Sequence, residues 1–296
     1  NPELGLQEFK ACAWQKELLT KYGFQIEDHF CNLETAYKAV YKGKKQGPKI
    51  AFLAEYDALP GLGHGCGHNL IAMVAVGCGI ACREFADEYG AEIDVIGTPA
   101  EETAGTKVPM SAMGVFKDYD AVMMAHPMFS NTDCFNSIAM DAYQIEFFGK
   151  PAHAANTPYE GINALDAMIN FFNLINAMRQ ETKPDARIHG VITDGGKAAN
   201  IIPDYTAASF YIRANRVADV KQLAERVRNC AAGAALATGC TYRMEYNEEN
   251  FKDTVRNHVL NDLAADYLDS FTDTPLIRLG DTYIPGSSDI GDVSYE

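Results

Sequence analysis

Residues 49–89 read KIAFLAEYDALPGLGHGCGHNLIAMVAVGCGIACREFADEY, and this stretch decides the fold. The apolar run Lys49–Tyr56 predicts a strand that ends at the turn signal DALPG. The Ala- and Gly-rich run Asn69–Tyr89 predicts a buried helix with Asn69 as its N-cap. Between them lies the loop GHGCGHN, residues 63–69. A strand, a loop that contains histidine and cysteine, and a helix follow one another here. This order is typical of an open α/β sheet that binds ligands at its strand ends.

Two further strands end in polar groups of the same kind. The apolar strand 93–97 leads to the pair Glu101 and Glu102, and the strand 121–125 leads to His126. Because the carboxyl ends of parallel strands meet at one edge of a sheet, we expect these loops to lie together. The pattern also predicts helices at 7–22, 108–116 and 253–270 and a strand at 36–41.

A second domain is expected over residues 137–247, flanked by a discontinuous first domain of residues 1–136 and 248–296. Its elements follow the order βαββαβ, which predicts a four-stranded sheet covered on one face by helices. The expected strands and helices span 142–148, 161–181, 187–193, 205–213, 217–238 and 241–246. The fold class is therefore α/β, with an open, mostly parallel sheet and helices on both faces, plus an inserted α+β domain.

Composition excludes several functions. A chain of 296 residues with 47% hydrophobic residues can bury a sizeable core. Its net charge of -15 opposes binding to phosphate backbones, so nucleic acid is not an expected partner. There is neither an unbroken apolar run of about 18 residues nor a signal sequence, so no membrane association is expected. The eight cysteines are scattered through apolar segments, which predicts free thiols and a cytoplasmic location.

The loops predict a hydrolytic metal centre. Cys66 offers a thiolate, His68 and His126 offer imidazoles, and Glu102 offers a carboxylate, a mixed set suited to zinc or a neighbouring divalent metal. Adjacent carboxylates at the end of an apolar strand repel each other unless a cation neutralises them. Glu101 is then left over as a general base beside the activated water.

Each of these residues also has a plainer interpretation. Cys66 could be a buried free thiol beside a structural histidine, or a nucleophile with its base. Glu101 and Glu102 could form an exposed acidic loop, and His126 could be an ordinary loop residue. His64 is a possible substitute ligand, and Glu55 and Asp57 either orient ligands or cap a turn. We expect Cys66 and His68 to point the same way through an extended segment, where side chains alternate.

Five ordered motifs resemble those of a known family. They are FLAEYDALPGLGHGCGHN, GTPAEETAGTK, VMMAHP, GKPAHAANTPYEGINAL and AANIIPD. Together they resemble the dimetal amidohydrolases and carboxypeptidases, a family that includes aminoacylases and auxin-conjugate hydrolases. The resemblance is nearest to the branch of p-aminobenzoyl-glutamate hydrolases and related dipeptidases, and it covers nearly the whole chain.

The resemblance implies a fold, an activity and a set of roles. Two divalent ions, zinc or manganese, would bind Cys66, His68, Glu102 and His126, with Glu101 as the base. The second domain would be a ferredoxin-like lid and dimerisation surface, forming a homodimer or pairing with a homologous subunit. His153 would reach across that dimer to the scissile carbonyl, and Asn200 and Arg213 would hold the substrate's carboxylate. Taken alone, these three are equally a loop histidine, a turn former and a strand-end charge.

The expected reaction is metal-dependent hydrolysis of an N-acyl or aminoacyl amino acid, a small-molecule amide or dipeptide. Two departures from the family stand out. Glu55 lies where relatives usually carry Asp or His, and the family's later metal-binding histidine has no counterpart except His258, which falls in an expected helix. The chain is therefore expected to be a fragment lacking both termini. The competing interpretations are a metal-binding, dimerising homologue without catalysis and a Cys66-dependent hydrolase.

Overall fold

The computed structural model describes residues 1–296 as two compact units. The first unit comprises Asn1–Cys134, Arg256–Gly280 and Asp292–Glu296, and the second comprises Phe135–Val255 and Asp281–Gly291. The division differs from the expected one because residues 135–136, 248–255 and 281–291 group with the second unit. There, Ile284 N donates to Asn136 O at 2.8 Å and Ile138 N donates to Gly286 O at 2.9 Å, just before the first strand of that unit.

The first unit contains a five-stranded mixed sheet of order β1-β2-β4-β3-β5. β3 pairs in parallel with β4 on one side and β5 on the other, whereas β1–β2 and β2–β4 are antiparallel. The strands are β1 (Gln25–Asp28), β2 (Tyr37–Lys42), β3 (Lys49–Ala54), β4 (Glu92–Gly97) and β5 (Ala121–Met123). The parallel part carries the loops predicted to hold the site, and β1 has no counterpart among the predicted strands.

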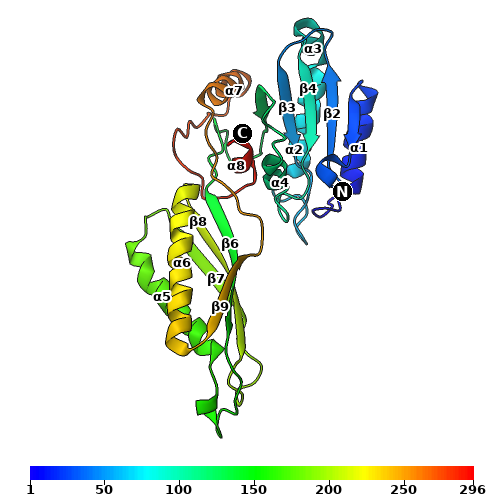
Figure 1. Ribbon diagram of the computed structural model, residues 1–296. Coiled ribbons are helices and arrows are strands. Elements are labelled where there is room, and N and C mark those ends of the chain that lie inside the picture. The colour runs from blue at the N-terminus through cyan, green and yellow to red at the C-terminus, as the bar shows by residue number, and fades with distance from the viewer. The chain divides into compact units, whose positions relative to one another are not determined.

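Helices α1 (Phe9–Lys21) and α2 (His68–Ala81) cover one face of this sheet, followed by α3 (Arg83–Tyr89) (Figure 1). The core beneath them joins α1, α2 and the sheet through Cys12, Leu19, Ala72, Ala75, Val76, Tyr37, Ala39, Ile93 and Val95. By length and composition alone, the run His68–Tyr89 could cross a membrane. The buried residues of its first part, α2, face β3 and β4.

Helix boundaries correct two expectations. α2 begins at His68 with Gly67 as its N-cap, so Asn69 lies inside the helix and is not the cap. α7 (His258–Phe271) begins later than expected because the Asn257 side chain accepts a hydrogen bond from Leu260 N at 3.1 Å and caps it there. Shorter helices are α4 (Lys107–Ala112), α8 (Ile290–Val293), η1 (Phe30–Asn32), η2 (Pro158–Glu160) and η3 (Arg179–Glu181).

The second unit has the predicted βαββαβ order. Its four strands lie antiparallel in the order β7-β8-β6-β9, with α5 and α6 packed on one face (Figure 1). This is the ferredoxin-like arrangement, and the expectation is confirmed. The elements are β6 (Ala139–Phe148), α5 (Ala164–Met178), β7 (Arg187–Asp194), β8 (Tyr205–Ala214), α6 (Val217–Thr238) and β9 (Thr241–Tyr246).

Candidate metal centre

Three loops of the first unit carry the candidate site. They leave the carboxyl ends of β3, β4 and β5, which lie side by side with β3 in the middle. The first loop carries Cys66 and leads to His68, the second carries Glu101 and Glu102, and the third carries His126. Parallel pairing therefore brings residues from positions 66 to 126 to one edge of the sheet.

Gly67 brings Cys66 and His68 together. Its φ of +77° is left-handed, and a Cβ at this position would lie 2.6 Å from Pro127 Cγ. The chain turns at this glycine and enters α2 directly. The expectation of an extended segment is wrong, because a turn and a helix start, rather than strand alternation, bring the thiol and the imidazole together.

Asp57 fixes the orientation of His68. Asp57 Oδ1 accepts a hydrogen bond from His68 Nδ1 at 2.8 Å, and Asp57 Oδ2 accepts one from the backbone N–H of Glu102 at 3.0 Å. With Nδ1 donating, Nε2 is the nitrogen left to bind a metal, the arrangement common among metal-binding histidines. Burial raises the pKa of Asp57, but these two hydrogen bonds, together with the charges of His68 and Lys107, leave the pKa below its usual value.

The predicted ligand atoms converge around His68. One ligand atom each from Cys66, His68 and Glu102 lie within 4.8 Å of one another, and so do atoms from Glu55, His68 and His126. The rings of His68 and His126 are 5.9 Å apart between centroids. His126 Nδ1 donates to Pro127 O at 2.8 Å, so its Nε2 is also the nitrogen suited to a metal.

The carboxylates of the pair face the same imidazole. His68 Nε2 lies 3.8 Å from Glu102 Oε1 and 3.9 Å from Glu101 Oε2. The side chains of Glu101 and Glu102 are 13% and 18% exposed, so the pair does not form the exposed acidic loop that was the plainer alternative. Burial lowers the pKa of His68, but the hydrogen bond to Asp57 and the surrounding negative charges raise it to about 9. So much negative charge in one place favours a cation.

Cys66 is a poor candidate for a nucleophile. Burial, its hydrogen bond to Glu102 and the nearby carboxylates raise the pKa of its thiol to about 12. A catalytic cysteine needs a lowered pKa, whereas a thiol is deprotonated readily when it binds a metal. The two other histidines considered, His64 and His258, belong to none of the three-residue donor groups. The donor set of sulfur, two nitrogens and a carboxylate thus fits divalent ions.

Glu55 and Lys107 form a buried ion pair next to this centre. Both side chains are fully buried, and Lys107 Nζ lies 2.6 Å from Glu55 Oε1, while Glu55 Oε2 lies 3.4 Å from His68 Nε2. Glu55 was expected to orient ligands or cap a turn, but Lys107 was missed. A lysine at the start of a short helix gives no sequence signal that it is buried.

In the second unit, His153 and Asn200 are neighbours and Arg213 is remote from both. His153 forms an isolated bridge with Ile201, and Ala154 N donates to Asn200 O at 3.0 Å. His153 Nδ1 accepts from the backbone N–H of Asn156 at 3.2 Å. Arg213 lies at the far end of β8, eight residues beyond Tyr205, which is about 26 Å along a strand.

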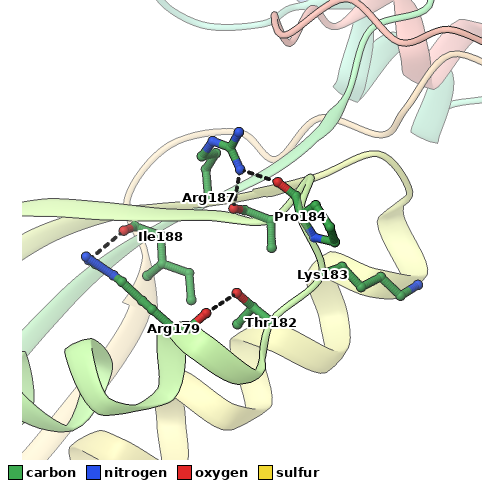
Figure 2. Close-up of a pocket in the computed structure, with 7 residues that line it drawn as sticks. Arg179, Thr182, Lys183, Pro184, Arg187 and Ile188 are labelled. Carbon is green, nitrogen blue, oxygen red and sulfur yellow. Dashed lines mark hydrogen bonds between the residues drawn. The ribbon is translucent and has the colours of Figure 1, made fainter.

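A pocket of about 330 Å³ lies elsewhere in this unit, between the end of α5 and the start of β7 (Figure 2). Its cationic side chains bond to other groups of the same unit. Arg179 donates to Ile188 O at 2.7 Å, Arg187 donates to Pro184 O at 2.6 Å, and Lys183 pairs with Asp219 at 2.7 Å. These bonds hold the connection between α5 and β7, and none of the predicted site residues lines the pocket.

Comparison with known proteins agrees with this geometry. Residues 140–238 match a family described as a peptidase dimerisation domain. The chain is 35% identical to mouse Xaa-Arg dipeptidase over 99% of its own length and 71% of that protein's length. The chain belongs to the M20 metallopeptidase family. It is also 33% identical to one of the subunits of the p-aminobenzoyl-glutamate hydrolase of Escherichia coli, covering 84% of this chain and 56% of that one.

Solved structures share the fold. A putative aminohydrolase from methicillin-resistant Staphylococcus aureus superposes with a TM-score of 0.83 at 21% identity, covering 98% of this chain and 80% of that one. A dinuclear metal-binding M20 peptidase from Bacillus subtilis gives 0.76 at 19%, covering 98% and 81%. The resemblance drawn from the five motifs is confirmed, and the protein is an enzyme that hydrolyses amide bonds.

Proposed function

We propose that two divalent ions, zinc or manganese, bind Cys66, His68, Glu102 and His126, and that Glu101 is the general base of amide hydrolysis. The convergence of these ligand atoms around the His68 imidazole carries the proposal. Glu55 stays outside the ligand set because the Lys107 ammonium already neutralises it. A metal-binding homologue without catalysis would have no need of Glu101, a spare carboxylate beside the ligands.

The chain's own residues would carry the protons. When bound, the two ions would lower the pKa of water and polarise the scissile carbonyl. Glu101 takes the proton from the attacking water and later delivers it to the leaving amine, so one carboxylate serves as base and then acid. Asp57 keeps the Nδ1 proton on His68, and Pro127 O keeps the Nδ1 proton on His126, so neither imidazole changes tautomer during turnover.

Arg213 supports a substrate with a free carboxylate. Its Nε is buried without a hydrogen-bond partner, no carboxylate pairs with it, and its guanidinium lies 5.5 Å from the Tyr211 ring centroid. Burial lowers the pKa of Arg213, and an incoming carboxylate would compensate that cost bidentately. The names of the mouse and Escherichia coli relatives also support a dipeptide or an N-acyl amino acid as substrate.

A homodimer would bring the remote groups to one substrate. His153 and Asn200 are separated from Arg213 by the length of β8, which is too far for one small molecule to touch all three. A second copy can supply the missing group. β7 supports this because it pairs only with β8 and leaves Val191 62% exposed on a free edge, where a partner strand can add. A homologous partner subunit would serve equally.

The eight cysteines support a cytoplasmic location. None of them is paired in a disulfide, and Cys12 and Cys240 are buried among apolar side chains. Free thiols persist in a reducing compartment. Fractionation of the source cells, with activity followed in each fraction, tests this location.

Glu101→Gln tests the catalytic role. We expect turnover of a dipeptide panel with C-terminal Arg, Glu and neutral residues to fall by about 10²- to 10⁴-fold with the metal retained. Glu102→Gln, the matched control on the adjacent residue, should lose metal as well as activity. A Glu101→Gln enzyme with substantial activity rejects the assignment.

Arg213→Ala tests the binding of the substrate's carboxylate. This variant should raise KM for free-carboxylate substrates much more than for their amides. An equal effect on both kinds of substrate would show that Arg213 does not bind the carboxylate.

A further inference from the structure

Glu8 is a fully buried carboxylate in the first unit that forms no ion pair. It lies immediately before α1, with 0% of its surface exposed. Its two oxygens accept hydrogen bonds instead, Oε2 from Thr35 Oγ1 at 2.9 Å and Oε1 from the backbone N–H of Ala100 at 2.8 Å. A buried carboxylate is costly, so these bonds indicate a specific role.

Capping of α1 does not account for this carboxylate. The Glu8 side chain makes no cap hydrogen bond to the helix. Glu3 caps the helix instead, because its Oε2 accepts hydrogen bonds from the backbone N–H of Lys10 at 3.1 Å and of Ala11 at 2.9 Å. Glu8 instead reaches across 92 residues of sequence to the loop after β4.

Ala100 has an unusual backbone conformation directly before the glutamate pair. Its φ of +59° is left-handed, a conformation that is unfavourable for a residue with a Cβ. Its carbonyl accepts hydrogen bonds from the N–H groups of Ala104 and Gly105, both at 2.9 Å. The Glu8 carboxylate fixes the other side of the same residue, the N–H group. Such strain persists only where the surroundings hold it, and it collects at functional sites.

We infer that Glu8 is a positioning residue for Glu101. By accepting the Ala100 N–H, Glu8 holds the strained turn that directs Glu101 into the centre. Asp57 fixes the following peptide by accepting the N–H of Glu102 at 3.0 Å. The Glu101 backbone is thus held by a buried carboxylate on each side. The inference rests on the proposed role of Glu101 as base, and the Glu8 side chain bonds to Thr35 and Ala100 rather than to a ligand atom.

Three variants of the full-length holoenzyme test it. Glu8→Ala removes the acceptor, Glu8→Gln keeps an amide oxygen for the Ala100 N–H, and Glu3→Ala is the control, a carboxylate lost at the same helix end without contact to the loop. A displacement of about 1 Å can cost up to 10²-fold, so we expect Glu8→Ala to lower kcat by about 10- to 100-fold with KM and bound metal unchanged. Glu8→Gln should stay within about threefold of wild type, and Glu3→Ala should match wild type.

Hydrogen–deuterium exchange gives a second readout independent of activity. The Ala100 amide should exchange faster in Glu8→Ala than in wild type and remain protected in Glu3→Ala. Should Glu8→Ala not fold, Thr35→Val removes the donor to Oε2, and we expect it to lower kcat with KM unchanged. The inference is overturned if Glu8→Ala, or Thr35→Val where Glu8→Ala does not fold, keeps the wild-type kcat. It is also overturned if the activity lost by that variant is explained by a loss of bound metal or by a higher KM. A wild-type holoenzyme without amidase activity would overturn the proposed function instead.

Discussion

Asp57 joins the two halves of the centre, because one carboxylate holds His68 Nδ1 at 2.8 Å and the backbone N–H of Glu102 at 3.0 Å. Asp57 lies on the loop after β3, at the N-terminal side of the cysteine motif. A single residue therefore sets the imidazole tautomer and places the glutamate pair. This explains how ligands from two of the three loops could be ready before any ion arrives.

Asp57→Ala should therefore weaken metal binding. Loss of such a supporting carboxylate typically costs about 10- to 100-fold in affinity. Competition with a chromogenic chelator measures this. Asp28→Ala, which removes an exposed carboxylate paired with Lys16 at 2.7 Å, is the control and should bind metal as wild type does. Equal affinity in Asp57→Ala and wild type would show that His68 does not need this partner.

Gly67→Ala should disrupt the cysteine loop. The new Cβ would meet Pro127 Cγ at 2.6 Å and would force a left-handed φ of +77° on alanine, at a cost of about 1–3 kcal/mol. We expect a lower unfolding midpoint and weaker metal binding. Gly77→Ala is the control, because this α2 glycine has nothing within 4 Å of its Cβ position and alanine favours a helix. Similar outcomes for both variants would contradict the account.

Lys107→Met should destabilise the first unit strongly. It leaves Glu55 buried without its cation, and breaking a buried pair typically costs about 3–5 kcal/mol. Adding Glu55→Gln should recover much of the loss, because the uncompensated charge is gone. Lys42→Met, in a pair whose lysine is 69% exposed, should cost at most about 1 kcal/mol. Denaturant unfolding measures all four proteins, and a double variant no better than Lys107→Met rejects the pairing.

The metal-free protein should lose stability as pH rises. The pKa of His68 is raised from 6.5 to about 9 in the fold, so the folded state holds this proton more tightly than the unfolded state. That stabilisation is present below about pH 6.5 and is lost as pH rises to about 9. Metal affinity should rise over the same interval, because a metal must displace the proton. His68→Gln should remove the pH dependence of both the stability and the metal affinity. If the variant and wild type show the same dependence of stability on pH, the prediction is contradicted.

The sequence predicted the elements better than their junctions. The βαββαβ order, β3 and β4 follow from apolar periodicity and were found close to the expected bounds. β1 was missed because QIED alternates too weakly to stand out. The start of α2 was misplaced because Gly67 adopts a left-handed turn, which no periodicity reveals.

Some residues of the site could also be predicted from the sequence, and others could not. Residues whose chemistry is unusual in a loop, such as Cys66 and His68, could be picked out from sequence. Lys107 and Glu8 could not, because an ordinary charged residue near a helix start is usually exposed. Their burial depends on contacts with Glu55 and Ala100, which are distant in sequence.

Anomalous diffraction from crystals grown with zinc or manganese tests the central claim most directly. The account predicts two anomalous peaks per chain, each marking a bound ion. The ligand atoms should be Cys66 Sγ, Nε2 of His68 and His126, and the Glu102 carboxylate, with ion–ligand distances of about 2.0–2.3 Å for zinc. Glu101 should lie beside them without bonding to either ion. Peaks absent from these four residues, or placed elsewhere in the chain, would contradict it.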